Sequence, residues 1–375
     1  MKILVIALAG IGDTLLATPL IAELRAQFPD AVLDAFVLWP GSKDILEGNP
    51  HLNTVHQCNL ITESRLRALR FLWRLRRQRY DISINAHPQS RRVYRLVAWI
   101  IGARQRLSHA YDNACWLDRL LVNRVIPQDY SIHGVENNLR LVELLGRRPI
   151  LPQADCQVYL SPADEQWAES FLRQHELLDR PRLGIHIGSG GTKNLRLKRW
   201  PFDCYLQLIR RLTHELPNTA ILLLGGPEEQ VEHTQILRLT PGRSVFVPQT
   251  GTLREAAALI KRCHVFLSVD TALMHLAAAV KVPHQIVIEA PTLNTTNLPW
   301  RQPFTLVPNP AVHGRNLEFY RYDGRGIRGT AEELTRCMAS VTVDQVFAVL
   351  KDALTTVEAS SPSAGKPLDA GNHQA

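Results

Sequence analysis

The chain lacks the cysteine and histidine spacings that disulfide frameworks and metal sites require. Its six cysteines are scattered along 375 residues with no C-x-x-C pair, and its fourteen histidines include no H-E-x-x-H or similar spacing. The pattern predicts a protein of a reducing compartment that holds no structural metal.

Long apolar segments are also absent. The first apolar run, residues 3–9, is interrupted by Gly10, Gly12 and Asp13, so it is too short for the apolar region of a signal peptide and is typical of a buried first strand. No other stretch is long and apolar enough to span a membrane. We therefore expect a cytoplasmic protein.

What the chain does contain is an ordinary globular composition, with 45% hydrophobic and 21% charged residues. Its length favours two domains, each large enough for a full hydrophobic core. The net charge of +8 is unevenly distributed, which points to a basic surface on one part of the molecule.

Strand and helix patterns alternate along the chain, which predicts an α/β fold of doubly wound parallel sheets. We expect a first domain at 1–155, whose strands after the N-terminal one lie at 31–38, 54–57, 81–85 and 105–108. Prolines and polar residues near 149–163 predict a linker, and a second domain follows at 156–340.

The N-terminal strand is followed by a glycine turn and a helix. Gly10 and Gly12 begin a G-x-G-x-x-G fingerprint, but Leu15 occupies the third position and Asp34 lies inside the next strand, which argues against a nicotinamide site. One hypothesis is that the turn exposes Asp13 at the mouth of a crevice as a general base. The alternative is that Asp13 only caps the helix.

A basic amphipathic helix is predicted within residues 63–81. Helical spacing places four arginines in one stripe beside an apolar stripe that includes Trp73. Such a surface suits an anionic lipid headgroup or a phosphorylated glycan, although a solvated arginine face explains the same pattern. The four arginines are Arg67, Arg70, Arg74 and Arg77.

The second domain opens with a strand and a glycine-rich loop at 188–191. The bare backbone of this loop can wrap a phosphate, and Ser189, Thr192 and Lys198 supply hydroxyls and a positive charge. The alternative is a flexible turn with a solvated lysine.

Two later strand ends carry further candidates. Glu228 is placed to accept hydrogen bonds from a ribose diol, or it only favours the next helix through the dipole. Gly251 forms the tight turn before a helix that Thr252 caps.

The stretch VFLSVDTALMHLAAA, residues 265–279, predicts a buried strand that ends at Asp270 and a helix that starts near Thr271. The free N–H groups of the first turn of that helix can bind a phosphate, and His275 follows one turn later. The alternative is that Asp270 only caps the helix and His275 only packs in the protein interior.

Four motifs together resemble a known family. GIGDTLLATP (10–19), KRWP (198–201), VDTALMHLAAA (269–279) and CMASVTVDQV (337–346) are similar, in order and spacing, to motifs of the ADP-heptose-dependent heptosyltransferases that build the lipopolysaccharide inner core. The resemblance covers about residues 1–354. It implies a GT-B architecture, in which two facing Rossmann-like domains hold the acceptor and the nucleotide sugar.

The resemblance also implies an inverting single displacement without metal or other cofactor, which agrees with the absence of a D-x-D motif. It assigns the base to Asp13 and the acceptor surface to the first domain. The donor residues that we expect are Ser189, Thr192 and Lys198 at the diphosphate, Thr271 and Ala272 as backbone donors, Asp270 at the sugar, Glu228 at the ribose, Gly251 at the adenine, and His275 nearby.

The sequence departs from the family in three respects beside this site. Ala272 replaces the usual glycine, EAPT at 289–292 replaces the more usual G-P-T, and the loop between Ser189 and Lys198 is long. By resemblance, a C-terminal helix at 341–356 crosses back to the first domain, and the Ser, Pro, Gly and Ala-rich residues 357–375 form a disordered tail.

The expected protein is thus a glycosyltransferase, with ADP-heptose as donor and a lipid-anchored anionic saccharide as acceptor, in peripheral contact with the inner membrane and without nucleic acid. A transferase of the same fold with another nucleotide sugar or a protein acceptor is one alternative. A nicotinamide-dependent dehydrogenase and a nucleic-acid binder are alternatives of other classes.

Overall fold

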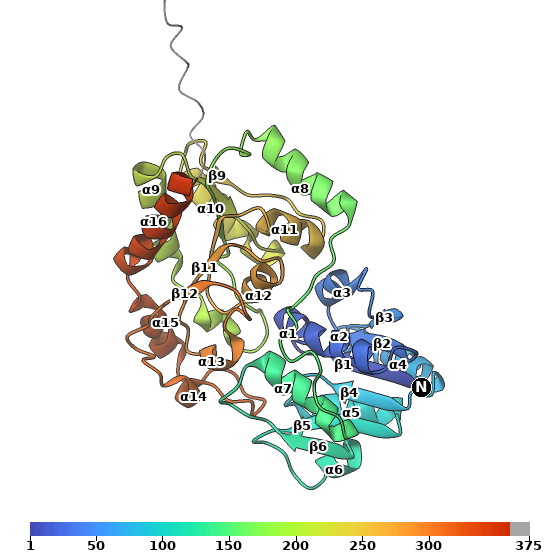
Figure 1. The fold of residues 1–375 in the computed structure, drawn as a ribbon. Coiled ribbons are helices and arrows are strands. Elements are labelled where there is room, and N and C mark those ends of the chain that lie inside the picture. The colour runs from blue at the N-terminus through green and yellow to red at the C-terminus, as the bar shows by residue number, and fades with distance from the viewer. Residues whose placement is uncertain (361–375) are drawn as a thin grey trace, which may run out of the picture.

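Two Rossmann-like domains lie against each other in the computed structural model, which describes residues 1–360 (Figure 1). Each domain contains a six-stranded parallel sheet, with strand orders β3-β2-β1-β4-β5-β6 and β12-β11-β10-β7-β8-β9. The two sheets therefore have the same doubly wound topology, and the predicted α/β architecture is confirmed. The topology reverses between β1 and β4 and between β7 and β10, where such sheets bind ligands.

The first domain contains the elements up to the 3-10 helix η1. Its strands are β1 (Lys2–Ala7), β2 (Val32–Val37), β3 (Thr54–Gln57), β4 (Ile82–Asn85), β5 (Gln105–Ala110) and β6 (Arg124–Pro127). Its helices are α1 (Ile11–Leu16), α2 (Thr18–Gln27), α3 (Pro40–Leu46), α4 (Arg65–Arg77), α5 (Arg92–Ile101), α6 (Asp118–Leu121), α7 (Gly134–Arg140) and η1 (Leu141–Leu145).

The second domain contains the elements from α8 onward. Its strands are β7 (Arg182–Ile185), β8 (Ala220–Leu223), β9 (Val245–Phe246), β10 (Val265–Ser268), β11 (His284–Ile288) and β12 (Phe304–Val307). Its helices are α8 (Pro162–Gln174), η2 (Leu195–Lys198), α9 (Phe202–Glu215), η3 (Pro227–Glu229), α10 (Gln230–Leu239), α11 (Leu253–Ile260), α12 (Ala272–Ala279), α13 (Asn294–Asn297), α14 (Asn316–Phe319), α15 (Ala331–Ala339) and α16 (Val343–Ser360).

The central strands β1 and β10 are largely apolar because helices cover both faces of each sheet. Ile3 and Val5 of β1 belong to one core cluster, whereas Leu4 and Ile6 belong to another on the opposite face. Two of the edge strands, β6 and β12, lack this signal. β6 is mostly exposed and β12 is mostly half-buried, which explains why their patterns did not predict strands.

The segment between η1 and α8 spans residues 146–161, and the domain boundary that the sequence predicts at 155/156 falls within it. Its first half is tied to the first domain, because the Glu23 carboxylate accepts hydrogen bonds from the Ile150 N–H (2.9 Å) and the Leu151 N–H (2.6 Å). α8 is tied to the second domain through Glu165, which pairs with Lys261 and Arg262 of the α11 region.

The C-terminal helix lies on the second domain, and the expected crossing to the first domain was wrong for this helix. α16 packs against α9, β10, β11 and β12 (Figure 1). The cause is its apolar stripe, since Val346, Phe347, Leu350 and Leu354 are buried in the core of the second sheet. The helix also continues to Ser360, so residues 357–360 are helical where a disordered tail was expected, and residues 361–375 lie outside the described residues.

The two domains meet at the N-terminal ends of α1 and α12. This approach depends on Gly12, because a Cβ placed there would lie 2.6 Å from His275 Cδ2 and 3.3 Å from Ala272 Cα. A second contact is aromatic: the rings of Tyr130 and Tyr322 stack with centroids 5.9 Å apart, and the Tyr322 N–H donates to the Tyr130 hydroxyl (3.1 Å).

We expect Gly12→Ala to loosen the domain contact, because the added methyl group cannot fit without moving α1 or α12. Overpacking of this kind costs about 1–3 kcal/mol. Thermal unfolding and limited proteolysis in the linker should therefore show lower stability and faster cleavage. Gly226→Ala is the matched control, because the nearest atom to its Cβ is Glu229 Oε2 at 4.0 Å. Equal behaviour of the two variants would show that the contact tolerates a side chain.

Candidate functional site

The candidate site lies where the carboxyl-terminal edges of the two sheets face each other. Asp13 follows β1 in the first domain, and Asp270 follows β10 in the second. The contact between α1 and α12 brings the two carboxylates close enough for the charge of Asp270 to raise the pKa of Asp13. The structure thus joins two residues that are separated by most of the chain.

Asp270 forms a buried ion pair with Lys198. Lys198 Nζ lies 3.1 Å from Asp270 Oδ2, and the same oxygen accepts a hydrogen bond from Thr292 Oγ1 at 3.0 Å. Burial alone would raise the pKa of Asp270, but Lys198, His275 and the hydrogen bonds outweigh it and lower the pKa. Asp270 is therefore a fixed negative charge next to a fixed positive one.

The pKa of Asp13 is shifted in the opposite direction to that of Asp270. Burial raises its pKa to about 6, and the charge of Asp270 adds to the rise. The Gly10 N–H donates to Asp13 Oδ2 at 2.6 Å and, together with Lys198 and Lys193, opposes it. Asp13 therefore also caps α1, and the two hypotheses for this residue are compatible. A carboxylate with a pKa of about 6 is a stronger base than an ordinary aspartate.

The first turn of α12 provides backbone donors. Thr271 is the N-cap, and its Oγ1 accepts from the Met274 N–H (3.3 Å) and is hydrogen-bonded to His186 Nδ1 (3.0 Å). The N–H groups of Ala272 and the next residue have no intrahelical partner, as in any first turn. An anion placed here gains both these donors and the helix dipole.

His275 is buried and lies against the first domain. Its Nε2 is 3.9 Å from Asp270 Oδ1, which is longer than a hydrogen bond. Burial lowers its pKa to about 4, although Asp270 opposes that shift, so the ring is neutral at physiological pH. Across the domain contact it lies against Gly12, where an added Cβ would be 2.6 Å from His275 Cδ2.

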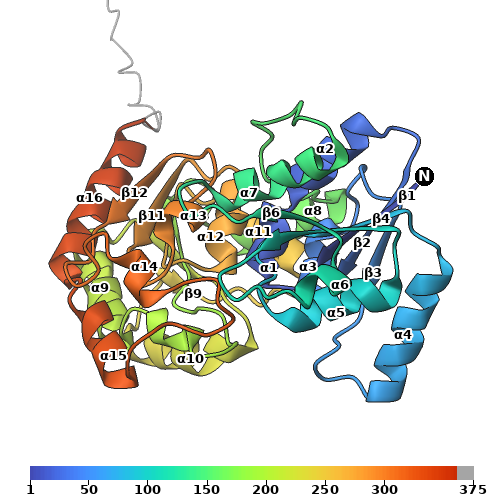
Figure 2. The same ribbon diagram turned by 90° about the horizontal axis from the view of Figure 1, so that it is seen from below.

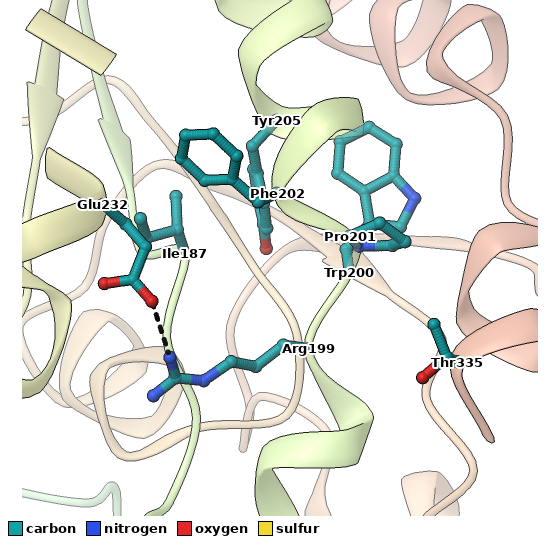
Figure 3. Close-up of a pocket in the computed structure, with 8 residues that line it drawn as sticks. All are labelled: Ile187, Arg199, Trp200, Pro201, Phe202, Tyr205, Glu232 and Thr335. Atoms are coloured by element: carbon teal, nitrogen blue, oxygen red, sulfur yellow. Dashed lines mark ion pairs between the residues drawn. The ribbon is translucent and has the colours of Figure 1, made fainter. Parts of the chain in front are cut away.

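Ser189 is held by contacts within its own domain. Its hydroxyl donates to the Leu195 carbonyl (2.9 Å) and accepts from Arg199 Nε (3.2 Å). Arg199 also pairs with Glu229 at 2.7 Å and with Glu232 at 3.7 Å, beside a small cavity behind the loop that Trp200 and Phe202 help to line (Figure 3). Arg199 therefore anchors the glycine-rich loop, a role that the sequence did not predict.

The other expected donor residues lie on neighbouring loops of the same sheet edge. Thr192 is exposed on the loop after β7. Glu228 follows β8, has a side chain that is 56% exposed, and lies 3.7 Å from Arg199 Nη2. Gly251 follows β9, and its N–H donates to Glu255 Oε2 at 2.6 Å. The strand order β10-β7-β8-β9 therefore places the expected residues in a row.

The four arginines of the predicted stripe lie outside this site. Arg67, Arg70, Arg74 and Arg77 are exposed on α4, which is part of the first domain. Ser64 caps the helix, and Leu72 and Leu75 bury its inner face. The predicted amphipathic helix is confirmed, and its partner stays a prediction.

Several residues near the site were not predicted. Thr292 belongs to the EAPT segment and orients Asp270. Lys193 is close enough to Asp13 to influence its pKa and donates to the Arg325 carbonyl at 2.8 Å. Tyr322 of the second domain packs on His87, with ring centroids 4.5 Å apart, directly after β4 of the first domain. The polar run after the buried strand β4 was a usable signal for His87, whereas the position of Tyr322 depends on tertiary contacts alone.

Residues 1–360 contain neither a candidate metal site nor a candidate membrane-spanning helix. No group of three or more histidine, cysteine, aspartate or glutamate side chains in this range could hold a metal ion. No helix in it has the length and apolar character needed to cross a membrane.

Comparison with known proteins gives a consistent result. Residues 68–313 match the family model described as glycosyltransferase family 9 (heptosyltransferase). Lipooligosaccharide heptosyltransferase 2 of Haemophilus influenzae is 27% identical over 306 residues, covering 78% of this chain and 84% of the relative. Lipopolysaccharide heptosyltransferase 3 of Escherichia coli is 25% identical over 287 residues, covering 72% and 78%.

Solved structures share the fold. A glycosyl transferase family 9 protein from Veillonella parvula superposes with a TM-score of 0.73 at 18% identity, covering 95% of this chain and 97% of that one. The E. coli ADP-heptose lipopolysaccharide heptosyltransferase II superposes with a TM-score of 0.69 at 20% identity, covering 96% and 100%.

The raised pKa of Asp13 predicts a pH-dependent effect on stability. Its pKa of about 6 in the folded protein exceeds the ordinary value of 3.8, so ionised Asp13 destabilises the fold above pH 6. That cost decreases as the pH falls through 6 and vanishes below 3.8. Asp13→Asn, which keeps an oxygen for the Gly10 N–H, should therefore be more stable than wild type by about 1–3 kcal/mol near pH 8.

Thermal melting of both proteins near pH 8 and near pH 4 measures this difference, which should largely disappear at the lower pH. If Asp13→Asn melts lower than wild type near pH 8, the cap contributes more than the buried charge costs.

Proposed function

The chain belongs to glycosyltransferase family 9 (heptosyltransferase), and on that premise we propose that it moves heptose from ADP-heptose to a lipopolysaccharide inner-core acceptor. The proposed acceptor is a lipid-anchored, anionic saccharide, and the protein acts at the cytoplasmic face of the inner membrane. Relatives named as lipopolysaccharide and lipooligosaccharide heptosyltransferases support the acceptor class. An E. coli relative of the same fold, named for ADP-heptose, supports the donor.

The observation that carries the proposal is the position of Asp13 relative to the Lys198–Asp270 pair. The base candidate belongs to one domain, and the buried ion pair and the α12 N-terminus belong to the other. A transferase must hold two substrates face to face, so functional groups on both sides of a domain contact suit transfer between them. A nicotinamide dehydrogenase or a nucleic-acid binder leaves this arrangement without a purpose.

The strand order supports an orientation for the donor. Asp270 after β10 would hold sugar hydroxyls, and Ser189, Thr192 and Lys198 after the adjacent β7 would meet the diphosphate. Glu228 after β8 would accept from the ribose, and Gly251 after β9 would lie against the adenine. Adjacent strands are about 4.8 Å apart, so these four positions extend over roughly 14 Å, which is comparable to an extended nucleotide sugar.

The proposed reaction is a single displacement with inversion. The acceptor hydroxyl oxygen attacks the anomeric carbon of the heptose while Asp13 takes the hydroxyl proton. The bond between the anomeric carbon and the β-phosphate oxygen breaks, and its electron pair leaves with ADP. Lys198 and the N–H groups of Thr271 and Ala272 would stabilise the charge that develops on the diphosphate, so that no metal is needed.

The departures from the family affect the sugar side of this site. Ala272 keeps its backbone donor, but its Cβ takes space that glycine leaves open. Thr292, in the segment that replaces G-P-T, hydrogen-bonds Asp270. Both residues are candidates for setting the sugar specificity. His275, which is neutral and packed against Gly12, is proposed to support the α12 N-terminus.

Asp13→Asn should lower kcat by about 10²–10⁴-fold, which is the usual contribution of general-base catalysis. In wild type, kcat/KM should rise through pH 6 and level off above it, because the base must be ionised. The variant should lose this rise while ADP-heptose affinity stays near wild type. Steady-state kinetics from about pH 5 to 9 test both points, and normal turnover by the variant would exclude Asp13 as the base.

Lys198→Met and Asp270→Asn should affect donor binding differently. Loss of the lysine charge should weaken ADP and ADP-heptose alike, by roughly 10–100-fold. Asp270→Asn removes a negative charge beside the diphosphate, so ADP should bind at least as tightly as in wild type, whereas ADP-heptose should lose affinity.

Calorimetric titration in the presence of EDTA measures the affinities of ADP and ADP-heptose for wild type and for both variants. Equal ADP affinity in wild type and Lys198→Met would contradict the diphosphate assignment. Binding that appears only after magnesium or manganese is restored would contradict metal independence.

A further inference from the structure

Large apolar side chains are exposed on the outer faces of three helices of the first domain. Trp73 on α4, Trp99 on α5 and Trp116 just before α6 are 56%, 51% and 73% exposed. Leu66, Leu96 and Leu120 on the same helices are 68%, 40% and 61% exposed. Tryptophan is a residue that folded proteins mostly bury, so three exposed ones in one region indicate a surface that contacts something else.

These helices form one continuous platform. α4 packs against α5, and α5 packs against α6, on the same side of the first domain (Figure 2). Arg76 Nη1 donates to the Ile100 carbonyl at 2.8 Å, which joins α4 to the end of α5. Arg95 Nη1 lies 2.8 Å from Asp118 Oδ2, and this buried ion pair joins α5 to α6. The helices that carry the exposed side chains are therefore joined to one another.

The platform also has a positive charge that is only partly compensated, since Arg67 pairs with Glu63 at 3.7 Å. α4 has the sequence RLRALRFLWRLRR, which contains six arginines and no acidic residue. Arg70, Arg74 and Arg77 surround a shallow pocket with Trp73, and no residue of the described chain forms an ion pair with these three. Like charges at helical spacing repel each other, so bound anions would relieve this repulsion.

We propose that the platform formed by the outer faces of α4, α5 and α6 docks the protein on an anionic lipid leaflet. The arginines bind lipid phosphates, and the tryptophan and leucine side chains enter the interfacial region, where amphipathic aromatic rings are favoured. The inference rests on the proposed function only in that a lipid-anchored acceptor requires the enzyme to reach a membrane. A second copy of the chain does not fit this surface, because a two-fold contact would bring two arginine clusters together.

Sedimentation with vesicles tests the charge contribution. Wild type should bind phosphatidylcholine vesicles that contain phosphatidylglycerol, bind pure phosphatidylcholine vesicles much more weakly, and lose binding as salt rises. Replacing Arg67, Arg70, Arg74 and Arg77 by glutamine should weaken binding to the anionic vesicles by at least about 100-fold at low salt, because each arginine contributes roughly five-fold. Arg173→Gln and Arg336→Gln on exposed helices of the second domain are the control for loss of arginine charge elsewhere, and they should be compared with the pair Arg70→Gln and Arg74→Gln. Binding that is unchanged in the fourfold variant would overturn the proposal.

Brominated lipids test the apolar contribution, because bromine in the acyl chains quenches tryptophan that enters the interface. Wild-type fluorescence should fall on binding, and the fall should be smaller in Trp73→Ser, Trp99→Ser and Trp116→Ser. Val231→Ser, at a site that is 77% exposed in the second domain, should behave like wild type. Melting temperature checks that each variant folds. Vesicle binding without quenching in wild type would overturn the insertion of these side chains.

Two further measurements separate this inference from the proposed function. Turnover of ADP-heptose on a soluble, delipidated acceptor should be unchanged in the tryptophan variants, so failed transfer with intact vesicle binding would reject only the proposed reaction. Analytical ultracentrifugation detects whether a second copy of the chain covers the platform. A dimer that Trp99→Ser or Trp116→Ser dissociates would assign the platform to a second copy of the chain and overturn the lipid assignment.

Discussion

The absence of a side chain at Gly12 is the constraint on which the rest of the site depends. It lets the N-terminal ends of α1 and α12 approach across the domain contact. Helix N-termini are electropositive, so their approach is unfavourable unless negative groups lie near them. Asp13 and Asp270 supply that negative charge, and a phosphate group would add to it. The same close approach that closes the two domains therefore creates a region suited to anions.

Lys198 lies closer to one of the two carboxylates than to the other, so the two aspartates differ in pKa. Lys198 contacts Asp270, whose pKa falls, whereas Asp13 keeps a raised pKa because burial and the Asp270 charge outweigh its favourable contacts. A fixed charge and a titratable group are thereby obtained from the same residue type. The difference comes from geometry, since both residues follow the end of a buried parallel strand. Removal of the lysine would change both groups.

The sequence predicted those features that depend on local patterns. Buried strands such as β1 and β10 were recognisable because parallel sheets need continuous apolar runs, and Asp13 and Asp270 were recognisable because they follow such runs. The edge strands β6, which is mostly exposed, and β12, which is mostly half-buried, had no such pattern. Long-range contacts could not be predicted from local patterns. The hydrogen bond from Arg199 to Ser189, the packing of Tyr322 on His87 and the position of α16 each depend on tertiary structure. The family resemblance predicted that α16 crosses back to the first domain, whereas the apolar stripe of the helix packs on the second domain.

The row of loops along the second sheet separates the residues proposed to recognise the nucleoside from those proposed to recognise the sugar. Residues proposed to contact the nucleoside follow β8 and β9, at one side of the row, whereas Asp270 and Thr292 follow β10 and β11, at the other. The two groups have no residue in common, and β7 lies between them. Substitutions after β10 and β11 can therefore alter the choice of sugar while the nucleoside contacts stay intact, and the reverse also holds. Changes at the nucleoside end can therefore leave the catalytic centre between the domains intact, whereas changes at the sugar end involve Asp270, whose charge also raises the pKa of Asp13.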